Sequence, residues 1–232
     1  MLTQVLVLDT ETTGLDPMTG RCIEVAAVRY SLLHFCVIEA YSSLLWGPAS
    51  NLMEKVNHIP EKSLPCGDSA EAVWGGVSGM ASTCDAILAH NADFDRQWVP
   101  NDPVRCAALL ELPWICTCSG VTWPNQDKEN GSLISLALAH GLGVVDPHRA
   151  LSDCLLLARL MTRCHELGHD VQAMLEQGRR PQAMFQAIVP FDDKDLAKAA
   201  GFKWEASTKR WIRKMAIEDA GKLGFPTRKV DG

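Results

Sequence analysis

The 232-residue sequence lacks three features that would place it in other classes of protein. Its nine cysteines include no C-x-x-C pair, so neither a zinc ribbon nor a disulfide framework is indicated. No apolar run approaches the ~20 residues that a membrane-spanning helix needs. The N-terminus has no cation ahead of its first apolar run and turns acidic at Asp9, unlike a signal peptide. We therefore expect reduced thiols, no membrane partner and a cytoplasmic location.

The 47% hydrophobic content of the chain is ample for one ordinary core. Its charge, however, is distributed unevenly along the sequence. Residues 1–177 hold 10 Lys and Arg against 21 Asp and Glu, a net charge of -11. Residues 178–232 hold 12 against 7, a net charge of +5. A Gly-Arg-Arg-Pro segment at 178–181 interrupts the preceding helical pattern. We predict two domains, 1–177 and 181–232, the second small and basic.

Short apolar runs predict the strands of the first domain. They cover Val5–Thr10, Cys22–Ser31, His34–Leu45, Ala86–His90 and Pro113–Thr117, and the first three are expected to form an antiparallel meander. Helices are predicted over Ala70–Ser82, Asn91–Val99, Ser132–Gly141 and Ala150–Leu167, the last two ended by Gly141 and Gly168. This order favours an α/β fold with a mixed central sheet flanked by helices.

Four carboxylates come from separate segments of this fold. Asp9 and Glu11 end the first strand, Asp95 follows the fourth, and Asp153 lies in the last helix. Taken singly, each is explained as a surface residue, but converging like charges are tolerated mainly when divalent cations neutralise them. Residues i and i+2 of a strand share a face, so Thr10 points away from the two acids and leaves its backbone to a ligand. Oxygen ligands favour Mg²⁺ or Mn²⁺, and paired ions of this kind serve attack on phosphodiesters.

His148, in the stretch "PHRALSD", is the candidate general base. A regular helix through His148 and Asp153 would rotate them about 140° apart. We therefore place His148 in the loop before the helix, after Asp146 and Pro147, where its ring can reach over the metals. An imidazole can take a proton from water at neutral pH. The alternative is a loop histidine without a role.

Three motifs resemble those of a known family. "LDTETTGL", "AHNADFD" and "HRALSD" resemble the motifs of the DEDDh group (DnaQ-like) of 3′-5′ exonucleases, and over the first domain they are most similar to its bacterial exonuclease X branch. The resemblance implies a ribonuclease H-like exonuclease fold. It also implies two Mg²⁺ ions, replaceable by Mn²⁺, held by Asp9, Glu11, Asp95 and Asp153, with His148 as the general base.

The resemblance further implies a pocket for the terminal 3′ nucleotide. Its residues would be Thr10, Thr12, Gly14, Leu15, His58, Asn91 and Phe94. For the last three, the alternatives are a loop residue, a helix cap and a core aromatic. The sequence departs from the family pattern at two places, which concern how the nucleic-acid strand beyond that nucleotide is bound. Cys116 stands where many relatives have Asp, and the loop 119–130 replaces a basic helix.

The second domain has its own pattern. A strand ending at Pro190, a helix from Asp192 or Asp193 to Ala200, and a hairpin turning at 205–209 are predicted, giving a small α+β domain. It resembles a small domain of unknown function. We expect Trp204 and Trp211 to form a mini-core rather than a binding face. The cations that could form a basic strip are Lys203, Lys209, Arg210, Arg213 and Lys214.

A competing motif, "HELGH" at His165 to His169, satisfies the H-E-x-x-H pattern of zinc peptidases. That pattern needs one helix through both histidines, whereas Gly168 lies between them and is typical of a helix end.

Taken together, the sequence predicts a metal-dependent 3′-5′ exonuclease that releases nucleoside 5′-monophosphates from DNA 3′ ends, mainly single-stranded ones. The preference for DNA rests on the resemblance alone. The alternatives are a 3′-5′ exoribonuclease, a zinc metallopeptidase and a nucleic-acid-binding protein without catalysis; protein partners and dimerisation stay open.

Overall fold

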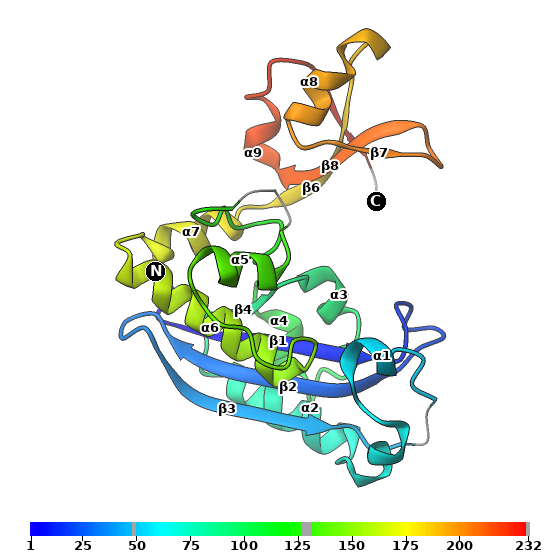
Figure 1. The fold of residues 1–232 in the computed structure, drawn as a ribbon, viewed down its shortest axis with the longest axis vertical. Helices are drawn as coiled ribbons and strands as arrows, with labels where there is room; N and C mark the ends of the chain where they lie inside the picture. Colours follow the sequence, from blue (N-terminus) through cyan, green and yellow to red (C-terminus); the bar gives the residue numbers. More distant parts are fainter. Residues whose placement is uncertain (48–49, 127–130, 231–232) are drawn as a thin grey trace. The chain divides into compact units, whose positions relative to one another are not determined.

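The predicted strands of the first domain join one mixed sheet in the computed structural model (Figure 1). Its order is β3-β2-β1-β4-β5, with β1 at Gln4–Thr12, β2 at Cys22–Ser31, β3 at Cys36–Leu44, β4 at Ala86–Ala89 and β5 at Trp114–Cys116. Strands β1 to β3 form the predicted antiparallel meander, whereas β4 and β5 run parallel to β1. The predicted mixed sheet is therefore confirmed.

The structure describes residues 1–47, 50–126 and 131–230, and it divides into the units Met1–Glu176 and Gln177–Gly232. Residues 127–130 of the loop 119–130 lie outside the described residues, and 119–126 contain no helix. No helix within the described ranges is long and apolar enough to cross a membrane.

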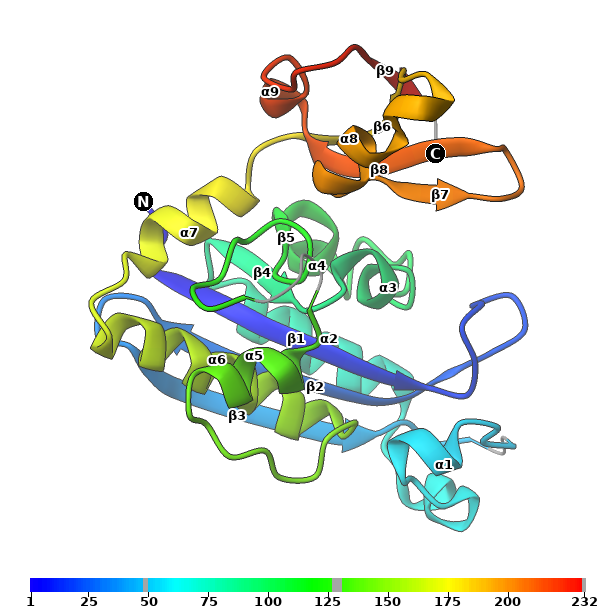
Figure 2. The same cartoon turned by 45° about the horizontal axis from the view of Figure 1, so that its top comes forward.

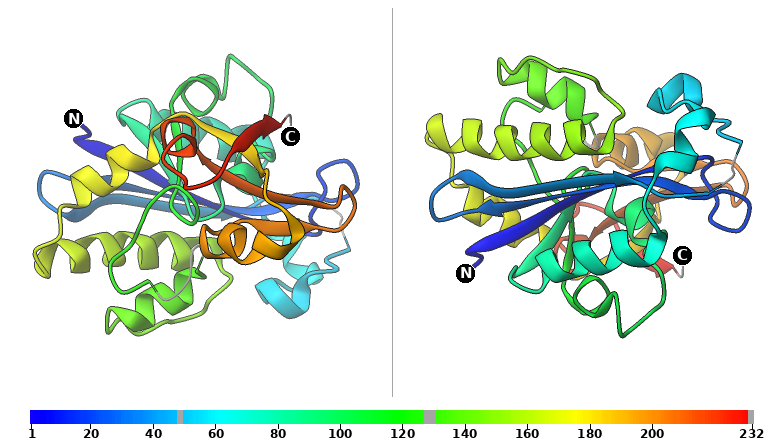
Figure 3. Two further views of the ribbon diagram at one scale, coloured as in Figure 1. Left: turned by 90° about the horizontal axis from the view of Figure 1, so that it is seen from above. Right: turned by 90° about the horizontal axis from the view of Figure 1, so that it is seen from below.

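Helices cover both faces of the first sheet (Figure 3). Helices α5 (Leu133–Ala139) and α6 (Ala150–Glu166) lie on one face, and α2 (Ala70–Ala81) and α4 (Ala107–Glu111) lie on the other. Along β1, Val5 and Val7 pack in the α6 layer, whereas Leu6 and Leu8 pack in the α2 layer. A strand buried on both faces needs apolar residues at every position, which explains the unbroken "VLVL" run.

The remaining segments of this unit are short. They are α1 (Glu54–Asn57), the 3₁₀ helix η1 (Glu61–Cys66), α3 (Ala92–Arg96) and α7 (Val171–Gly178). Helix α3 is shorter than the predicted Asn91–Val99, because the chain after Arg96 continues with turns in which the Trp98 and Val99 amides donate to the carbonyls three residues before them. Helices α5 and α6 are followed by Gly141 and Gly168 as predicted, and Gly168 adopts φ +85, which glycine tolerates best.

The second unit is a four-stranded antiparallel sheet with helices. Its strand order is β7-β8-β6-β9, with β6 at Gln182–Ala187, β7 at Lys203–Glu205, β8 at Arg210–Ala216 and β9 at Thr227–Val230. The first strand ends at Ala187, earlier than predicted. A 3₁₀ turn (Phe191–Asp193) leads into α8 (Lys194–Ala199), and α9 (Ile217–Ala220) precedes β9; the sequence analysis placed neither α9 nor β9.

Candidate active site

Strand alternation aims two of the acids at α6. Asp9 and Glu11 continue the odd-numbered side of β1, where Val5 and Val7 pack in the α6 layer. Asp153 lies in the first turn of α6. Carboxylate oxygens of Asp9, Glu11 and Asp153 lie within 4.8 Å of one another. Three of the four predicted carboxylates therefore share one site.

The fourth acid, Asp95, is buried beside them and bound to β1. Pairing between β1 and β4 ends at Val7 and Leu88, so Thr10 has no partner on β4. The Thr10 amide donates to Asp95 Oδ1 at 3.0 Å, and the Thr10 hydroxyl donates to the same atom at 2.8 Å. The prediction that the Thr10 backbone is left to a ligand is therefore wrong for its amide, which is bound to Asp95 where a neighbouring strand would otherwise lie.

Burial, joined for Asp9 and Glu11 by the charges of neighbouring acids, raises the pKa of these carboxyl groups. Burial, and then the charges of Asp95, Glu11 and Asp153, raise the pKa of Asp9 well above its usual range. Burial is also the main cause that raises the pKa of Glu11 from 4.5 to about 8. For Asp95, burial raises the pKa to about 7 although both Thr10 hydrogen bonds oppose the shift. A bound cation would reverse these shifts, because it favours the ionised carboxylates.

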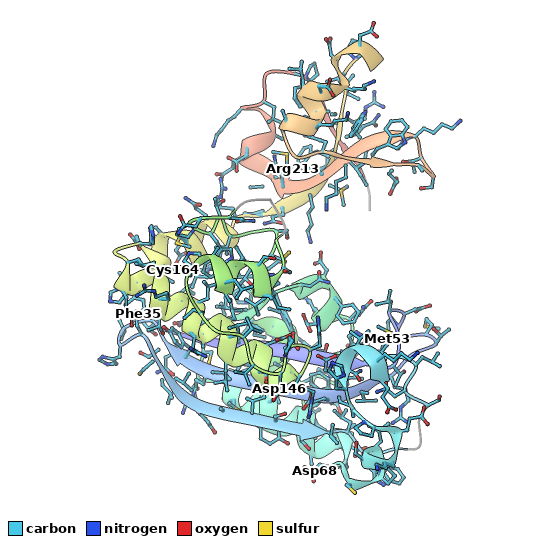
Figure 4. The ribbon with its side chains drawn as sticks, viewed as in Figure 1. Phe35, Met53, Asp68, Asp146, Cys164 and Arg213 are labelled. Carbon is cyan, nitrogen blue, oxygen red and sulfur yellow. The ribbon has the colours of Figure 1, made fainter. Side chains whose placement is uncertain are left out.

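His148 lies in the loop before α6, as placed by the sequence analysis, and its side chain is exposed. Figure 4 labels Asp146 in the same loop. Asp146 and His148 adopt φ +44 and φ +63, a region that L-residues rarely occupy. Burial raises the pKa of Asp153, while the charge and the backbone N–H of His148 lower it. The candidate base thus lies close enough to one of the candidate metal ligands to affect its pKa.

An ion pair that the sequence analysis missed lies next to this cluster. Glu24 of β2 is 3% exposed and stands opposite Glu11 in the strand register. Arg149 donates to both Glu24 carboxylate oxygens, from Nε at 3.1 Å and from a terminal nitrogen at 2.8 Å. The Ala150 amide donates to Glu24 Oε2 at 3.1 Å. The pair therefore ties β2 to the start of α6, between His148 and Asp153. A single Glu in the apolar run "CIEVAAV" was the available signal.

The loop after β1 carries three residues predicted to cradle a nucleotide. The Thr12 hydroxyl donates to the Gly14 carbonyl at 2.6 Å, and Leu15 is 74% exposed. Helix α1 lies beside this loop (Figure 2), because the buried Asn57 side chain donates to the Thr12 carbonyl at 3.2 Å. His58 follows Asn57 at φ +56 and is exposed. The structure thus brings the His58 segment to the end of β1, through an Asn57 contact that the sequence did not reveal.

Asn91 and Phe94 lie at the start of α3. Asn91 occupies the helix-cap position, but its side chain makes no cap hydrogen bond and is exposed. Phe94 is half-buried and meets the Trp98 ring edge-on, with 5.9 Å between ring centroids. The side chain of Asn91 therefore serves no capping role here, whereas Phe94 packs partly as a core aromatic.

The zinc-peptidase motif does not have the geometry that it requires. His165 belongs to α6 and stacks on Phe35, labelled in Figure 4, with ring centroids 3.6 Å apart. Helix α6 ends at Glu166, and His169 lies beyond Gly168, outside the helix. Within the described parts of the chain, Asp9, Glu11 and Asp153 form the one group of three or more side chains placed to hold a metal ion.

Comparison with known families agrees with this site. Residues 6–161 match the family model described as Exonuclease, so the chain belongs to this DnaQ-like family. Residues 183–230 match a domain of unknown function. Members of the DnaQ-like family depend on divalent metals, and the Asp9, Glu11 and Asp153 cluster is consistent with that dependence.

Individual relatives are similar over most of the chain. DNA polymerase III PolC-type of Thermotoga petrophila is 30% identical over 70% of this chain, but the chain spans only 12% of that protein's length. Exodeoxyribonuclease 10 of Escherichia coli K12 is 26% identical, with 77% of this chain and 76% of that protein covered.

Solved structures show the same ribonuclease H-like exonuclease fold. The structure of exonuclease X in complex with 5′ overhanging duplex DNA has a TM-score of 0.56 and 27% identity, covering 75% of this chain and 99% of that chain. Exonuclease I of E. coli in complex with a dT13 oligonucleotide has a TM-score of 0.57 at 15% identity, covering 96% of this chain and 68% of that chain. The predicted fold and family are therefore confirmed.

The first prediction concerns the pH dependence of stability. Because the pKa of Glu11 is raised to about 8, the folded, metal-free protein holds this proton more tightly than the unfolded chain. The free energy of unfolding should then fall as pH rises from about 5 to about 8. Thermal unfolding in EDTA should show this fall, and Glu11→Gln should reduce it without abolishing it, because the pKa values of Asp9 and Asp95 are raised as well. The matched variant Glu111→Gln removes an exposed carboxylate and should keep the wild-type slope. An unchanged slope in Glu11→Gln would contradict the electrostatic account.

The second prediction concerns the Glu24 and Arg149 pair. Arg149→Met leaves the buried Glu24 without its partner and should cost about 2–3 kcal/mol of unfolding free energy. Adding Glu24→Gln should recover most of that loss. The control is the exposed pair Arg163 and Glu166 on α6, where a double-mutant cycle should yield below ~0.5 kcal/mol. Denaturant titration of all variants measures both couplings, and equal couplings would show that the buried pair is not special.

Proposed function

We propose that this protein is a magnesium-dependent 3′-5′ exonuclease that releases nucleoside 5′-monophosphates from DNA, with single-stranded 3′ ends preferred. One observation carries the proposal, namely the convergence of Asp9, Glu11 and Asp153 within 4.8 Å at a strand end. Asp95 lies buried beside them, and the exposed His148 enters from the loop before α6.

The donor set fits hard divalent cations. Two Mg²⁺ ions, or Mn²⁺ in their place, would be held by Asp9, Glu11, Asp95 and Asp153 and would supply the positive charge that polarises a phosphodiester. Two thiols lie close enough for these acids to affect them, because burial and the nearby carboxylates raise the pKa of Cys22 and of Cys154. Neither thiol belongs to the group of described side chains placed to hold a metal ion, so that group offers oxygen donors, which suit Mg²⁺ or Mn²⁺.

His148 is proposed to take the proton from the attacking water. Its exposed imidazole and its position close enough to lower the pKa of Asp153 support this role. The Glu24 and Arg149 pair then acts as a positioning device, because it anchors the residue that follows His148. The proton leaves to solvent from the same exposed ring, which readies the base for another turnover.

The loop after β1 is proposed to receive the terminal nucleotide. A Cβ added at Gly14 would meet only the Gly20 Cα, at 3.9 Å, so contacts within the protein do not demand glycine there. A glycine allows a ligand to approach the backbone closely, and the exposed Leu15 beside it is free to contact a base. Thr12, His58, Asn91 and Phe94 would border the same nucleotide. Thr10 would contribute to this site by positioning Asp95, to which its hydroxyl donates a hydrogen bond.

The choice of DNA is supported by the relatives rather than by the geometry. Exodeoxyribonuclease 10 and the exonuclease X complex with duplex DNA are both more than 25% identical to this chain. The neighbouring structure "3'-end specific recognition of histone mRNA stem-loop by 3'-exonuclease" is 15% identical and shows the fold alone. RNA is therefore included as a competing substrate in the experiment.

The third prediction tests the reaction and its site together. Purified protein with Mg²⁺ should shorten 5′-labelled single-stranded DNA in a ladder and release the label of 3′-labelled DNA as a mononucleotide, and EDTA should stop both. Asp95→Asn should lower the rate by several orders of magnitude. Asp93→Asn, two residues earlier on α3 and exposed, should leave it within about threefold.

Two outcomes would contradict the proposal. Release of the 5′ label first would contradict the polarity, and RNA cleaved faster than DNA of the same sequence would contradict the substrate. Activity of Asp95→Asn within tenfold of wild type would remove this residue from the site. Thermal unfolding of both variants checks that each is folded.

The fourth prediction concerns the base. His148→Ala should lower kcat by about 10²–10⁴-fold, because one positioned base contributes on that order. Removing the base should also abolish the acidic limb of the pH profile of kcat. His34→Ala, at another exposed histidine, should preserve both the rate and the profile. Persistence of the acidic limb in His148→Ala would assign the proton transfer to another group.

A further inference from the structure

The sheet of the second unit has one covered face and one open face. Phe185 of β6 and Met215 of β8 pack with Ala197 of α8 and Ala220 of α9 in one core. Both helices therefore cover the face to which these odd-numbered residues of β6 and β8 point. Their even-numbered neighbours point to the opposite face. No residue of the described helices α8 and α9 shares a core with that opposite side.

The strand register places cations across the open face. Lys203 of β7 pairs with Ile212 of β8, Ile212 pairs with Gln186 of β6, and Gln186 pairs with Arg228 of β9. Register partners point to the same side, so these four residues form one row with a cation at each end. Three strand spacings of ~4.8 Å separate the ends by roughly 14 Å.

Two further cations flank the middle of this row. Arg210 and Lys214 lie two residues to either side of Ile212 on β8 and therefore share its face. Lys203, Arg210 and Arg228 are exposed. The one acid that this register places on the face, among the described strand residues, is Glu205, which accepts a hydrogen bond from the Thr208 hydroxyl.

The basic strip anticipated from the sequence is divided between the two faces. Trp211 and Arg213 point to the helix-covered side, where Trp211 packs against the core and Arg213 donates to the Ala200 carbonyl at 2.6 Å. Arg213 is labelled in Figure 4. Trp204, half-exposed, lies 5.5 Å from Trp211 and shares that side. The period of two along a strand separates them from Arg210 and Lys214.

We propose that this open face binds the phosphate backbone of a single-stranded nucleic acid. The cations at the ends and middle of the face would contact phosphates, while Ile212 and Met184 between them offer apolar contact to bases. Charge complementarity favours a polyanion, because residues 178–232 carry a net charge of +5. The inference rests on the proposed function to the extent that the bound strand is the substrate upstream of its 3′ end.

The test compares two double variants of the full chain. Arg210→Gln with Arg228→Gln removes two charges from the open face. The control, Lys209→Gln with Lys229→Gln, removes two charges at adjacent positions, one in the hairpin turn and one on the helix-covered side of β9. Both are placed in an Asp9→Asn background with Mg²⁺, so that a 5′-fluorescein-labelled dT20 probe stays intact. Fluorescence anisotropy then measures affinity at several salt concentrations.

The open-face variant should bind dT20 roughly 10- to 25-fold more weakly at 0.1 M salt, and its slope of log affinity against log salt should be smaller by about 1.4, or 0.7 for each lost phosphate contact. The control should lose less than threefold. Equal losses in the two variants would indicate general attraction and overturn the proposal. Unchanged affinity in the open-face variant would do the same and direct attention to a protein partner. A 20-base-pair duplex bound as tightly as dT20 would overturn the assignment to single strands.

This binding assay does not depend on hydrolysis, so its failure is distinguishable from failure of the proposed function. A chain that binds dT20 through the open face but cleaves no nucleic acid keeps this inference and loses the exonuclease assignment. A chain that cleaves DNA but binds dT20 equally well with and without the open-face cations does the reverse. Thermal unfolding of both double variants checks that the second sheet is intact.

Discussion

The structure of the first unit depends on holding like charges together in a poorly solvated place. Asp9, Glu11 and Asp153 converge within 4.8 Å, and Asp95 lies buried beside them. The guanidinium that opposes this charge belongs to Arg149, and it is already committed to Glu24. Such an arrangement is costly for a fold by itself, but it gains free energy from every divalent cation that it binds.

Well-packed secondary structure holds these acids together against their mutual repulsion. Asp9 and Glu11 project from the end of a strand that is buried on both faces, and Asp153 projects from the first turn of α6, so packing opposes backbone movement that would separate them. The two histidines proposed to act beside them, His58 and His148, both lie at positive φ. Backbone strain of this kind costs on the order of 1–3 kcal/mol at each residue and commonly accompanies functional sites.

The two units carry net charges of opposite sign. The first carries a net charge of -11, and an acidic surface repels a polyanion such as the substrate proposed for it. The second gathers cations on a sheet face that no described helix of its own unit covers. The binding proposed for this face would give the small domain a role beside the exonuclease domain.

Patterns within short segments were sufficient for much of this protein. The apolar runs, the glycines after α5 and α6, and the four carboxylates with His148 could all be read locally, because each depends on period, turn chemistry or spacing within about ten residues. The position of His148 before α6 followed from helix geometry alone.

Contacts between distant segments required the folded chain. Glu24 and Arg149 are 125 residues apart, Thr10 and Asp95 are 85 apart, and Asn57 and Thr12 are 45 apart. No local pattern encodes such pairs, because they arise only when strand register and helix packing place the segments side by side. The same reason accounts for the basic strip of the second unit. Most of its residues fall within Lys209–Lys214, but the pleat of β8 sends Arg210 and Lys214 to one face and Arg213 to the other.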